Sequence, residues 1–322
     1  MSSGSPGKSS NPQSFSNIDQ MMRCCLPAYA KINLFLRVVG KRADGYHELD
    51  TLFLQVDLAD ELQFESAATP GFSMSCNWNN VPLDETNICF RAYQLMSQAL
   101  GKQMGLHLHL EKRIPMGAGM GGGSSDAAVT LVALNHFMGG CLSESELFEM
   151  ALQLGSDVPF FLHGGLCHGA GRGEILTALP SLPAIYAVII APGIELSTKL
   201  VYQNLKIGLT TTRENTIFAD LNYDVQKFYE QDPGGRNDLE LWVLRTFPAL
   251  AQIKQKLLEA KALGACMTGS GSAFFGIFTH HQEALAAQRL LQEEYPTFIA
   301  RPVKCGIREI VKFLDQTEVF VG

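Results

Sequence analysis

The segment PMGAGMGGGSSD, residues 115–126, gathers glycines in front of two serines and an aspartate. Glycine loses more conformational entropy on folding than any other residue, so such a cluster needs a positive φ or a close backbone approach to explain it. The segment lies between a predicted strand and a strongly apolar predicted helix, SSDAAVTLVALNHFMGG. Because the first amides of a helix lack internal acceptors and the helix dipole is positive there, this arrangement predicts an anion site.

Three known anion-binding patterns can be compared with this loop. A Walker A loop requires a lysine before its final Ser or Thr, whereas Gly123 is followed directly by Ser124. Gly117, Gly119 and Gly122 match a dinucleotide GxGxxG fingerprint, but no strand-ending acidic residue follows about 20 residues later. The HRD and DFG motifs of protein kinases are missing from the sequence. The loop therefore indicates phosphate binding of another kind.

Length and composition predict a soluble globular protein. The chain has 322 residues, 46% hydrophobic and 18% charged, and no apolar run approaches the about 20 residues of a membrane helix. The net charge of −7 argues against a nucleic-acid-binding protein, yet it is compatible with a phosphorylated small-molecule ligand. The eight cysteines form no CxxC pair, which predicts reduced thiols in the cytoplasm and no zinc site.

Residues 1–22 are rich in Ser, Gly, Pro and Asn, and they are predicted to form a disordered tail. Because the segment is also rich in serine and poor in acidic residues, an organelle transit peptide and a cloning remnant stay open as alternatives.

Hydrophobic periodicity and turn residues predict the elements that must hold the glycine loop. Ahead of the loop, two strands flank the turn KRADGYH, and a helix and an alternating strand follow. Their predicted ranges are 30–40 and 47–58, with 60–66 continuing the second strand, then 86–101 for the helix and 105–114 for the last strand. Ser124, Ser125 or Asp126 is expected to cap the helix after the loop.

Beyond the loop, Ser143 and Glu146 form a predicted capping box for a helix that stops at Gly155. The remaining predicted elements are a strand at 184–193, a helix at 248–264 ending at Gly264, strands within 265–278, a helix at 281–295 and a strand at 298–306. This mixture lacks a regular βαβ alternation, which favours an α+β fold over a doubly wound sheet. The predicted division is a tail (1–22), an N-terminal domain (23–165) and a C-terminal domain (166–322).

The glycine loop resembles the phosphate-binding motif of the GHMP kinases, a Pro-x-Gly-x-Gly-x-Gly-x-Ser-Ser pattern. Two further stretches, PAYAKINLFLRVVGKRADGYHEL (27–49) and LGSDVPFFL (154–162), are similar to segments of those members that phosphorylate a cytidine diphosphate conjugate of methylerythritol. Weaker markers follow in family order: Asn87-Ile88, residues 237–240, and MTGSGSAFF at 267–275.

The resemblance implies a two-domain α+β fold with a ribosomal-protein-S5-like first domain, a ferredoxin-like second domain and an active site between them. The implied activity is transfer of the γ-phosphoryl group of ATP to an alcohol in non-mevalonate isoprenoid-precursor synthesis. ATP and Mg²⁺ are the implied cofactors, and a small molecule is the implied partner. A cytoplasmic monomer or homodimer is expected, with no nucleic-acid or membrane partner.

The resemblance also implies site residues. Asp157 matches the catalytic base, and Lys31 matches a lysine that favours the ionised carboxylate and stabilises charge on the transferring group. The implied ATP-binding residues are Asn87, Pro115, Met116, Gly117, Ala118, Gly119, Met120, Gly121, Gly122, Gly123, Ser124 and Ser125. The implied substrate-binding residues are Asn33, Tyr46, His47, Thr198 and Tyr202. No metal ligand is assigned, although Ser125 is a candidate.

Two alternatives stay open at this stage. One is a GHMP kinase for another alcohol, such as homoserine or mevalonate, and the GYH turn argues for the cytidine conjugate instead. The other is a catalytically silent binding protein of the same fold. The presence of both Lys31 and Asp157 argues against it, since function is read from the site and not from the fold.

Overall fold

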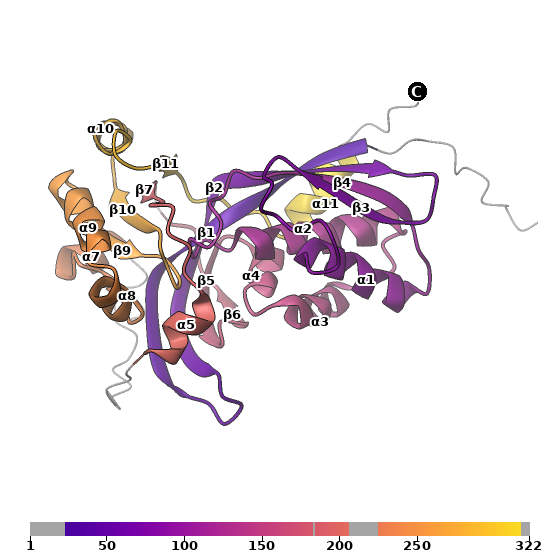
Figure 1. The fold of residues 1–322 in the computed structure, drawn as a ribbon, viewed down its shortest axis with the longest axis horizontal. Coiled ribbons are helices and arrows are strands. Elements are labelled where there is room, and N and C mark those ends of the chain that lie inside the picture. Colours follow the sequence, from indigo (N-terminus) through magenta and orange to yellow (C-terminus); the bar gives the residue numbers. More distant parts are fainter. Residues whose placement is uncertain (1–22, 183, 206–224, 317–322) are drawn as a thin grey trace, which may run out of the picture.

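The computed structural model describes residues 23–182, 184–205 and 225–316, so the predicted tail lies outside the described residues. Two sheets adjoin one another, and helices cover each of them (Figure 1). The larger sheet has seven strands in the order β3-β4-β2-β1-β8, with β5 paired to β2 and β6 to β5. The smaller has four, in the order β11-β7-β10-β9. The predicted α+β class is confirmed.

The strands of the larger sheet are β1 (Arg23–Lys41), β2 (His47–Ser66), β3 (Gly71–Cys76), β4 (Gly105–Glu111), β5 (Leu166–Gly171), β6 (Ile175–Ala178) and β8 (Arg236–Asn237). Strands β1 and β2 form a long antiparallel hairpin in register from Arg23↔Glu65 to Lys41↔His47. The two strands predicted around the KRADGYH turn are therefore confirmed, and both are longer than predicted. Strand β3 was not predicted.

Strand β1 connects the whole molecule because its even-numbered side chains enter three successive hydrophobic clusters. Leu26 lies under the helices of the larger sheet, Ile32 lies between the two sheets, and Val38 lies in the core of the smaller sheet. Successive strand residues point to opposite faces, so Lys31 and Asn33 face away from these clusters. Lys31 and Asn33 reach a cavity on that other face.

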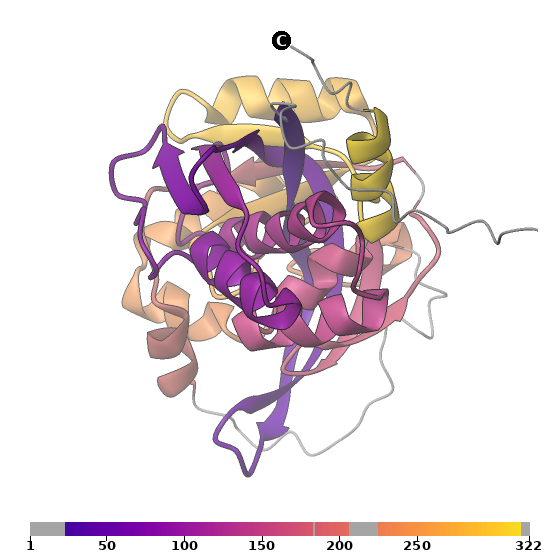
Figure 2. The same cartoon turned by 90° about the vertical axis from the view of Figure 1, so that its right-hand side faces the viewer.

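Helices α1 (Ile88–Leu100), α2 (Gly122–Phe137), α3 (Glu144–Leu154), α4 (Val158–His163) and α11 (Ile307–Gln316) cover the larger sheet. Figure 2 looks at this face, where α11 (yellow) packs beside α2. The predicted capping box at Ser143 and Glu146 is confirmed. The predicted cap of α2 is wrong, because Gly121 occupies the N-cap position at φ 71° and the helix already begins at Gly122. Only glycine adopts that left-handed conformation at low cost, so the serines fall inside the first turn.

The smaller sheet contains β7 (Tyr186–Ile190), β9 (Gly264–Met267), β10 (Phe274–Phe278) and β11 (Thr297–Ala300). The helices of this part are α5 (Thr198–Gln203), α7 (Val225–Gln231), α8 (Glu240–Thr246), α9 (Ala249–Glu259) and α10 (His281–Leu291). The helix predicted up to Gly264 ends earlier, at the α9 C-cap Ala260. Lys261 turns the chain at φ 70°, and Gly264 then starts β9. Strand β11 is shorter than predicted: beyond Ala300, Pro302 makes only an isolated bridge to Val56 because proline has no N–H to donate.

Several elements that follow residue 165 belong to the larger sheet or pack on its helices. Strand β5 pairs with β2 from Leu54↔Leu166 to Leu49↔Gly171, and β6 pairs with β5, so both strands extend the larger sheet. Strand β8 also joins that sheet, alongside β1, and α11 returns to pack on α2. The reason is the length of β2: β4 pairs only with residues 61–66 of this strand, so its first half leaves an open edge that β5 covers.

Candidate active site

A cavity of about 1460 Å³ opens between the two parts of the molecule. Its lining comes from β1, the β1–β2 turn, the glycine loop, the segment before α4, helix α5 and a second glycine-containing loop at residues 268–272. All predicted catalytic, ATP-binding and substrate-binding residues line it except Ser125. Ser125 is only 1% exposed and lies in the first turn of α2.

The glycine loop has three left-handed positions, Gly117, Gly119 and Gly121, with φ of 61°, 78° and 71°. Each also lies against neighbouring atoms. A Cβ on Gly119 would come within 2.2 Å of the Thr268 carbonyl oxygen, and a Cβ on Gly121 would come within 2.8 Å of the Phe161 ring. Backbone conformation and close packing therefore both require glycine at these positions. Because glycine has no side chain, the backbone amides between the loop and the start of α2 are not covered by side-chain atoms of these residues.

The second glycine-containing loop supports the first from behind. The Ala273 amide donates to the Ala118 carbonyl at 3.2 Å, and the Thr268 hydroxyl donates to the Gly119 carbonyl at 3.4 Å. The Asn237 side-chain amide donates to the carbonyls of Met267 and Gly269, at 2.8 Å each. The markers near residues 237 and 267–275 thus belong to one scaffold that holds the glycine loop in place.

Lys31 reaches the cavity from the middle of β1. Its backbone amide donates to the Met120 carbonyl at 3.0 Å, which fixes the strand to the glycine loop. Its Nζ donates to Asn33 Oδ1 at 2.6 Å and lies 3.8 Å from Asp157 Oδ2. Burial lowers the pKa of Lys31, while the charge of Asp157 and its hydrogen bond oppose that shift. The Lys31 ammonium is therefore held next to the predicted base, although burial removes water that would stabilise its charge.

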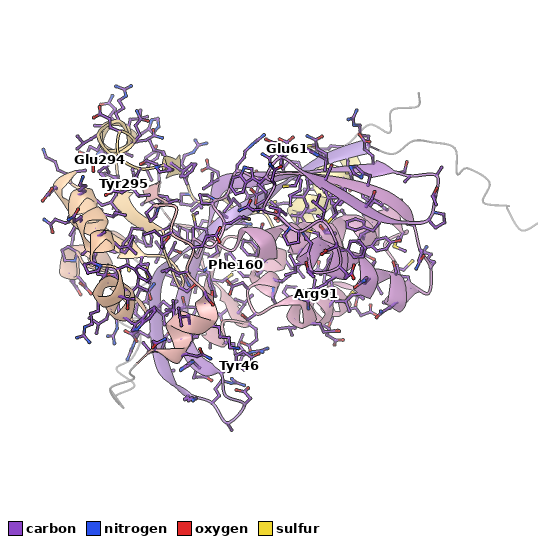
Figure 3. All side chains as sticks on the ribbon, in the orientation of Figure 1. Tyr46, Glu61, Arg91, Phe160, Glu294 and Tyr295 are labelled. Atoms are coloured by element: carbon purple, nitrogen blue, oxygen red, sulfur yellow. The ribbon has the colours of Figure 1, made fainter. Side chains whose placement is uncertain are left out.

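Asp157 occupies the N-cap position of α4 at φ −86° and ψ −17°, but its side chain makes no capping hydrogen bond. The side chain is 35% exposed, in contrast to the buried side chain of Lys31. Proline in the first two positions of α4 and the buried Phe160 after it hold the backbone of this turn. Figure 3 shows Phe160 in the interior of the molecule. The carboxylate can therefore accept a proton from a ligand in the cavity.

The other end of the cavity is aromatic. The His47 and Tyr202 rings stack with centroids 5.2 Å apart and an interplanar angle of 28°. Burial and the charge of Lys41 lower the pKa of His47, which favours the neutral imidazole with one donor and one acceptor nitrogen. Burial also raises the pKa of Tyr202, with a further contribution from Asp157. The Thr198 and Ser270 hydroxyls share a hydrogen bond of 2.9 Å.

Tyr46 lies next to His47, on the turn between β1 and β2. It is 56% exposed, and Figure 3 places it at the end of the molecule where this turn and α5 lie. The guanidinium of Arg172 lies 4.8 Å from the centroid of its ring. No local sequence pattern points to Arg172, because the contact joins two turns that are far apart along the chain.

Two of the polar residues predicted to bind ligands already use their side chains in hydrogen bonds within the protein. Asn87 caps α1, where its Oδ1 accepts from the Cys89 amide at 2.9 Å and its Nδ2 donates to the Pro82 carbonyl at 2.7 Å. Asn33 donates to the Thr51 hydroxyl at 2.8 Å while it accepts from Lys31. Asn87 therefore shapes the wall of the cavity, and Asn33 orients the lysine.

A buried charged cluster under the start of α2 was not predicted. Lys112 contacts the carboxylates of both Asp60 and Asp126, the latter at 2.9 Å. Asp60 also accepts from the amides of Arg113 and Ile114, whereas Asp126 Oδ1 is buried without a hydrogen-bond partner. A Cβ on Gly122 would lie 3.1 Å from Lys112 Nζ. No local pattern could reveal this cluster, because Asp60 lies on a different strand from Lys112.

Charge and burial act on this cluster in opposite directions. Burial lowers the pKa of Lys112, but the charges of Asp126 and Asp60 exceed that effect and leave it raised. Burial also raises the pKa of Asp126, to about 7; Lys112 opposes that shift and the charge of Asp60 adds to it. The two carboxylates thus compete for one ammonium.

The described ranges 23–182, 184–205 and 225–316 contain no group of three or more His, Cys, Asp or Glu side chains placed to hold a metal ion. Across those same residues, no helix combines the length and the hydrophobicity needed to cross a membrane.

Comparison with known proteins supplies two family matches. Residues 87–165 match the GHMP kinases N terminal domain, and residues 228–297 match the GHMP kinases C terminal domain. The chain is 39% identical over 280 residues to a 4-diphosphocytidyl-2-C-methyl-D-erythritol kinase of Geobacter sp. (strain M21), covering 87% of this chain and 98% of the relative. A protein of the same name from Solibacter usitatus is 43% identical and covers 84% of this chain and 85% of the relative.

Solved structures agree with these matches. A crystal structure of 4-(cytidine 5'-diphospho)-2C-methyl-D-erythritol kinase has a TM-score of 0.74 at 35% identity, covering 86% of this chain and 98% of that one. A homoserine kinase from Cytophaga hutchinsonii has a TM-score of 0.62 at 19% identity, covering 91% and 98%, so that likeness concerns the fold alone. The predicted two-domain GHMP kinase fold is confirmed.

Proposed function

Because the chain belongs to the GHMP kinase family, among the 4-diphosphocytidyl-2-C-methyl-D-erythritol kinases, we propose that it phosphorylates a hydroxyl of 4-diphosphocytidyl-2-C-methyl-D-erythritol. The chain is an ATP-dependent small-molecule kinase. One observation carries the substrate assignment: the Lys31–Asp157 pair and the His47–Tyr202 stack line the same cavity. A role in isoprenoid-precursor synthesis, a cytoplasmic location and a monomeric or homodimeric state remain predictions.

ATP fits the part of the cavity formed by the glycine loop. The three left-handed glycines leave the backbone amides open to phosphate oxygens, and the α2 N-terminus adds the positive end of a 16-residue helix. Beyond the loop, Val81, Ile88 and Leu110 supply apolar surface beside Asn87, which suits a flat nucleobase. The γ-phosphate would then lie toward Lys31, whose strand is bonded to the loop at Met120.

Phosphoryl transfer to an alcohol requires in-line positioning, charge neutralisation and an acceptor for the alcohol proton. Asp157 is the proposed acceptor, because its half-exposed carboxylate lies 3.8 Å from the ammonium that favours its ionised form. Lys31 also neutralises negative charge that develops on the transferring group. Asn33 holds the Lys31 Nζ through a 2.6 Å hydrogen bond, so the ammonium is oriented before the substrates bind.

Mg²⁺ is proposed to enter with ATP, bound mainly by phosphate oxygens and water, where it would offset phosphate charge. The protein offers few ligands for it. Within the described cavity lining, the carboxylates are those of Asp126 and Asp157, and Asp126 is bound to Lys112. The buried Ser125 does not line the cavity and therefore does not fit a ligand role. This leaves Asp157 as the carboxylate available to the ion.

Cytidine recognition is assigned to the aromatic end of the cavity. Tyr46 offers an exposed ring face for stacking, and the neutral His47 offers a donor and an acceptor for the edge of the base. Tyr202 and Thr198 complete this wall from α5. Lys41 and Lys199 line the same cavity and add positive charge for a diphosphate.

The test is ADP release from ATP and Mg²⁺ with 4-diphosphocytidyl-2-C-methyl-D-erythritol, run beside homoserine, mevalonate and galactose. Turnover of the cytidine compound alone is the expected result. Asp157→Asn is expected to lower kcat by about 10²- to 10⁴-fold with ATP binding retained. Asp315→Asn serves as the control, since Asp315 is exposed on α11 and does not line the cavity. Preference for another alcohol, or near-normal activity of Asp157→Asn, would contradict the proposal.

A further inference from the structure

We propose that Arg172 is a positioning residue for nucleobase recognition: its guanidinium supports one face of the Tyr46 ring and leaves the opposite face to the cytosine of the substrate. This inference rests on the proposed function, because it assigns a support to a ring that the proposed function places against the base. Arg172 and Tyr46 line the same cavity, and 4.8 Å separates the guanidinium carbon from the ring centroid.

Tyr46 needs a support because it lies on an exposed turn. The bonds that hold this turn are local: the Arg42 amide donates to the Tyr46 carbonyl at 2.8 Å, and the Tyr46 amide donates to Asp44 Oδ1 at 3.1 Å. These bonds fix the backbone and leave the ring free to rotate. Among the described residues, Arg172 contacts the ring itself, with its guanidinium lying over the ring. An unsupported ring would lose rotamer freedom when a base stacks on it, which weakens binding.

The β5–β6 hairpin presents Arg172 at this place. Gly171 and Gly173 on either side of it have φ of 69° and 103°, so the tip of the hairpin turns sharply. The Gly171 amide donates to Glu48 Oε1 at 3.2 Å, and Gly171 pairs with Leu49 in the sheet register. The tip is therefore anchored to the first residues of β2, directly after Tyr46 and His47.

The Arg172 side chain is itself held. Glu174 accepts from the Arg172 backbone amide, and Glu174 Oε1 lies 3.5 Å from Arg172 Nε. A planar guanidinium lying over an aromatic face combines cation–π attraction with stacking, which a lysine ammonium does not reproduce. Arg172 therefore keeps one face of the ring covered, while the base adds to the other face.

The experiment measures binding of two probes, cytidine and cytidine 5'-diphosphate, by calorimetry to wild type and Arg172→Gln. A support acting through Tyr46 predicts that both probes weaken by the same factor, about three- to tenfold, which is the range expected for ordering one additional side chain on binding. In the kinase assay, KM for the cytidine substrate should rise by that factor, with kcat and KM for ATP unchanged. Arg172→Lys is expected to recover part of the affinity.

Controls separate this role from others. Arg113→Gln removes one exposed guanidinium outside this cavity and should leave both affinities unchanged. Since Arg172 and Tyr46 are in contact, Tyr46→Leu and Arg172→Gln should be non-additive, with the double variant little weaker than Tyr46→Leu alone. A loss confined to the diphosphate would show a direct phosphate contact and overturn the inference, as would additive losses.

The results that would contradict the proposed function differ from those that would contradict only the role of Arg172. If wild type binds neither probe and turns over another alcohol, both the substrate assignment and this inference are overturned. If wild type binds both probes and Arg172→Gln binds them equally well, only the inference about Arg172 is overturned.

Discussion

Two buried lysines line the same cavity, and their surroundings shift their pKa values in opposite directions. Lys31 is 3% exposed and has one carboxylate, Asp157, at 3.8 Å. Lys112 is 5% exposed and contacts two carboxylates, those of Asp60 and Asp126. The pKa of Lys31 is lowered by burial, whereas that of Lys112 is raised by the charges of its partners in spite of burial.

We propose that this difference separates a residue that acts in catalysis, Lys31, from one that acts in stability, Lys112. An ammonium with only one carboxylate nearby can interact strongly with a phosphoryl group that binds later. Until that group binds, the desolvated ammonium lowers the stability of the folded protein. An ammonium that already contacts two carboxylates is neutralised by them and cannot interact strongly with a phosphoryl group. It holds β2, the end of β4 and the first turn of α2 together beneath the phosphate loop.

The largest expected effect is on turnover. Lys31→Met removes the ammonium beside the proposed base and the transferring group, and kcat is expected to fall by about 10³-fold. ADP release with saturating substrates measures the loss, and calorimetric titration with ATP checks that nucleotide binding persists. Activity within tenfold of wild type would show that Lys31 is as structural as Lys112.

The second effect is on stability, and here the substitution of Lys112 is expected to have the larger effect. Lys112→Met leaves two buried carboxylates without their cation, and the free energy of unfolding is expected to fall by about 3 to 5 kcal/mol. Lys31→Met is the matched control: it removes an incompletely compensated charge, so the free energy of unfolding should stay the same or rise. Urea titrations followed by tryptophan fluorescence give both values, and equal losses in the two variants would remove the distinction.

The smallest effect concerns pH. The folded pKa of Asp126 is raised from 3.8 to about 7, so the folded state binds its proton more tightly than the unfolded chain does. The stabilisation from that proton is full below the unfolded value and is lost as pH rises through the folded one. Relative to Asp126→Asn, wild type is therefore expected to lose about 2 to 3 kcal/mol of stability between pH 5 and pH 8.

Asp315→Asn is the control for this experiment, because Asp315 is 62% exposed at its side chain. Its stability difference from wild type should not change over the same pH range. A difference between wild type and Asp126→Asn that stays constant from pH 5 to pH 8 would mean that Asp126 is ionised throughout and that Lys112 fully compensates both carboxylates.

Local patterns were sufficient wherever the cause was local. The long hairpin follows from apolar strands around a tight turn, and the capping box at Ser143 follows from two side chains three residues apart. The glycine loop before an apolar helix indicated an anion site, and the structure confirms the loop and the helix, with the cap moved to Gly121. The motifs around Lys31 and Asp157 pointed to a pair, and the fold brings the two side chains together.

By itself, then, the sequence determined the family and indicated the glycine loop, because both depend on residue types at short, fixed spacings. The pairing of Lys31 with Asp157, which are far apart in the chain, was implied by the family resemblance and not by spacing. Only the tertiary structure decided which lysine is compensated, that Ser125 is buried, that β5 and β6 extend the larger sheet, and that Arg172 covers Tyr46. Those features depend on contacts between residues more than 50 positions apart or on the exact start of a helix, and burial, which sets their energies, has no local signature.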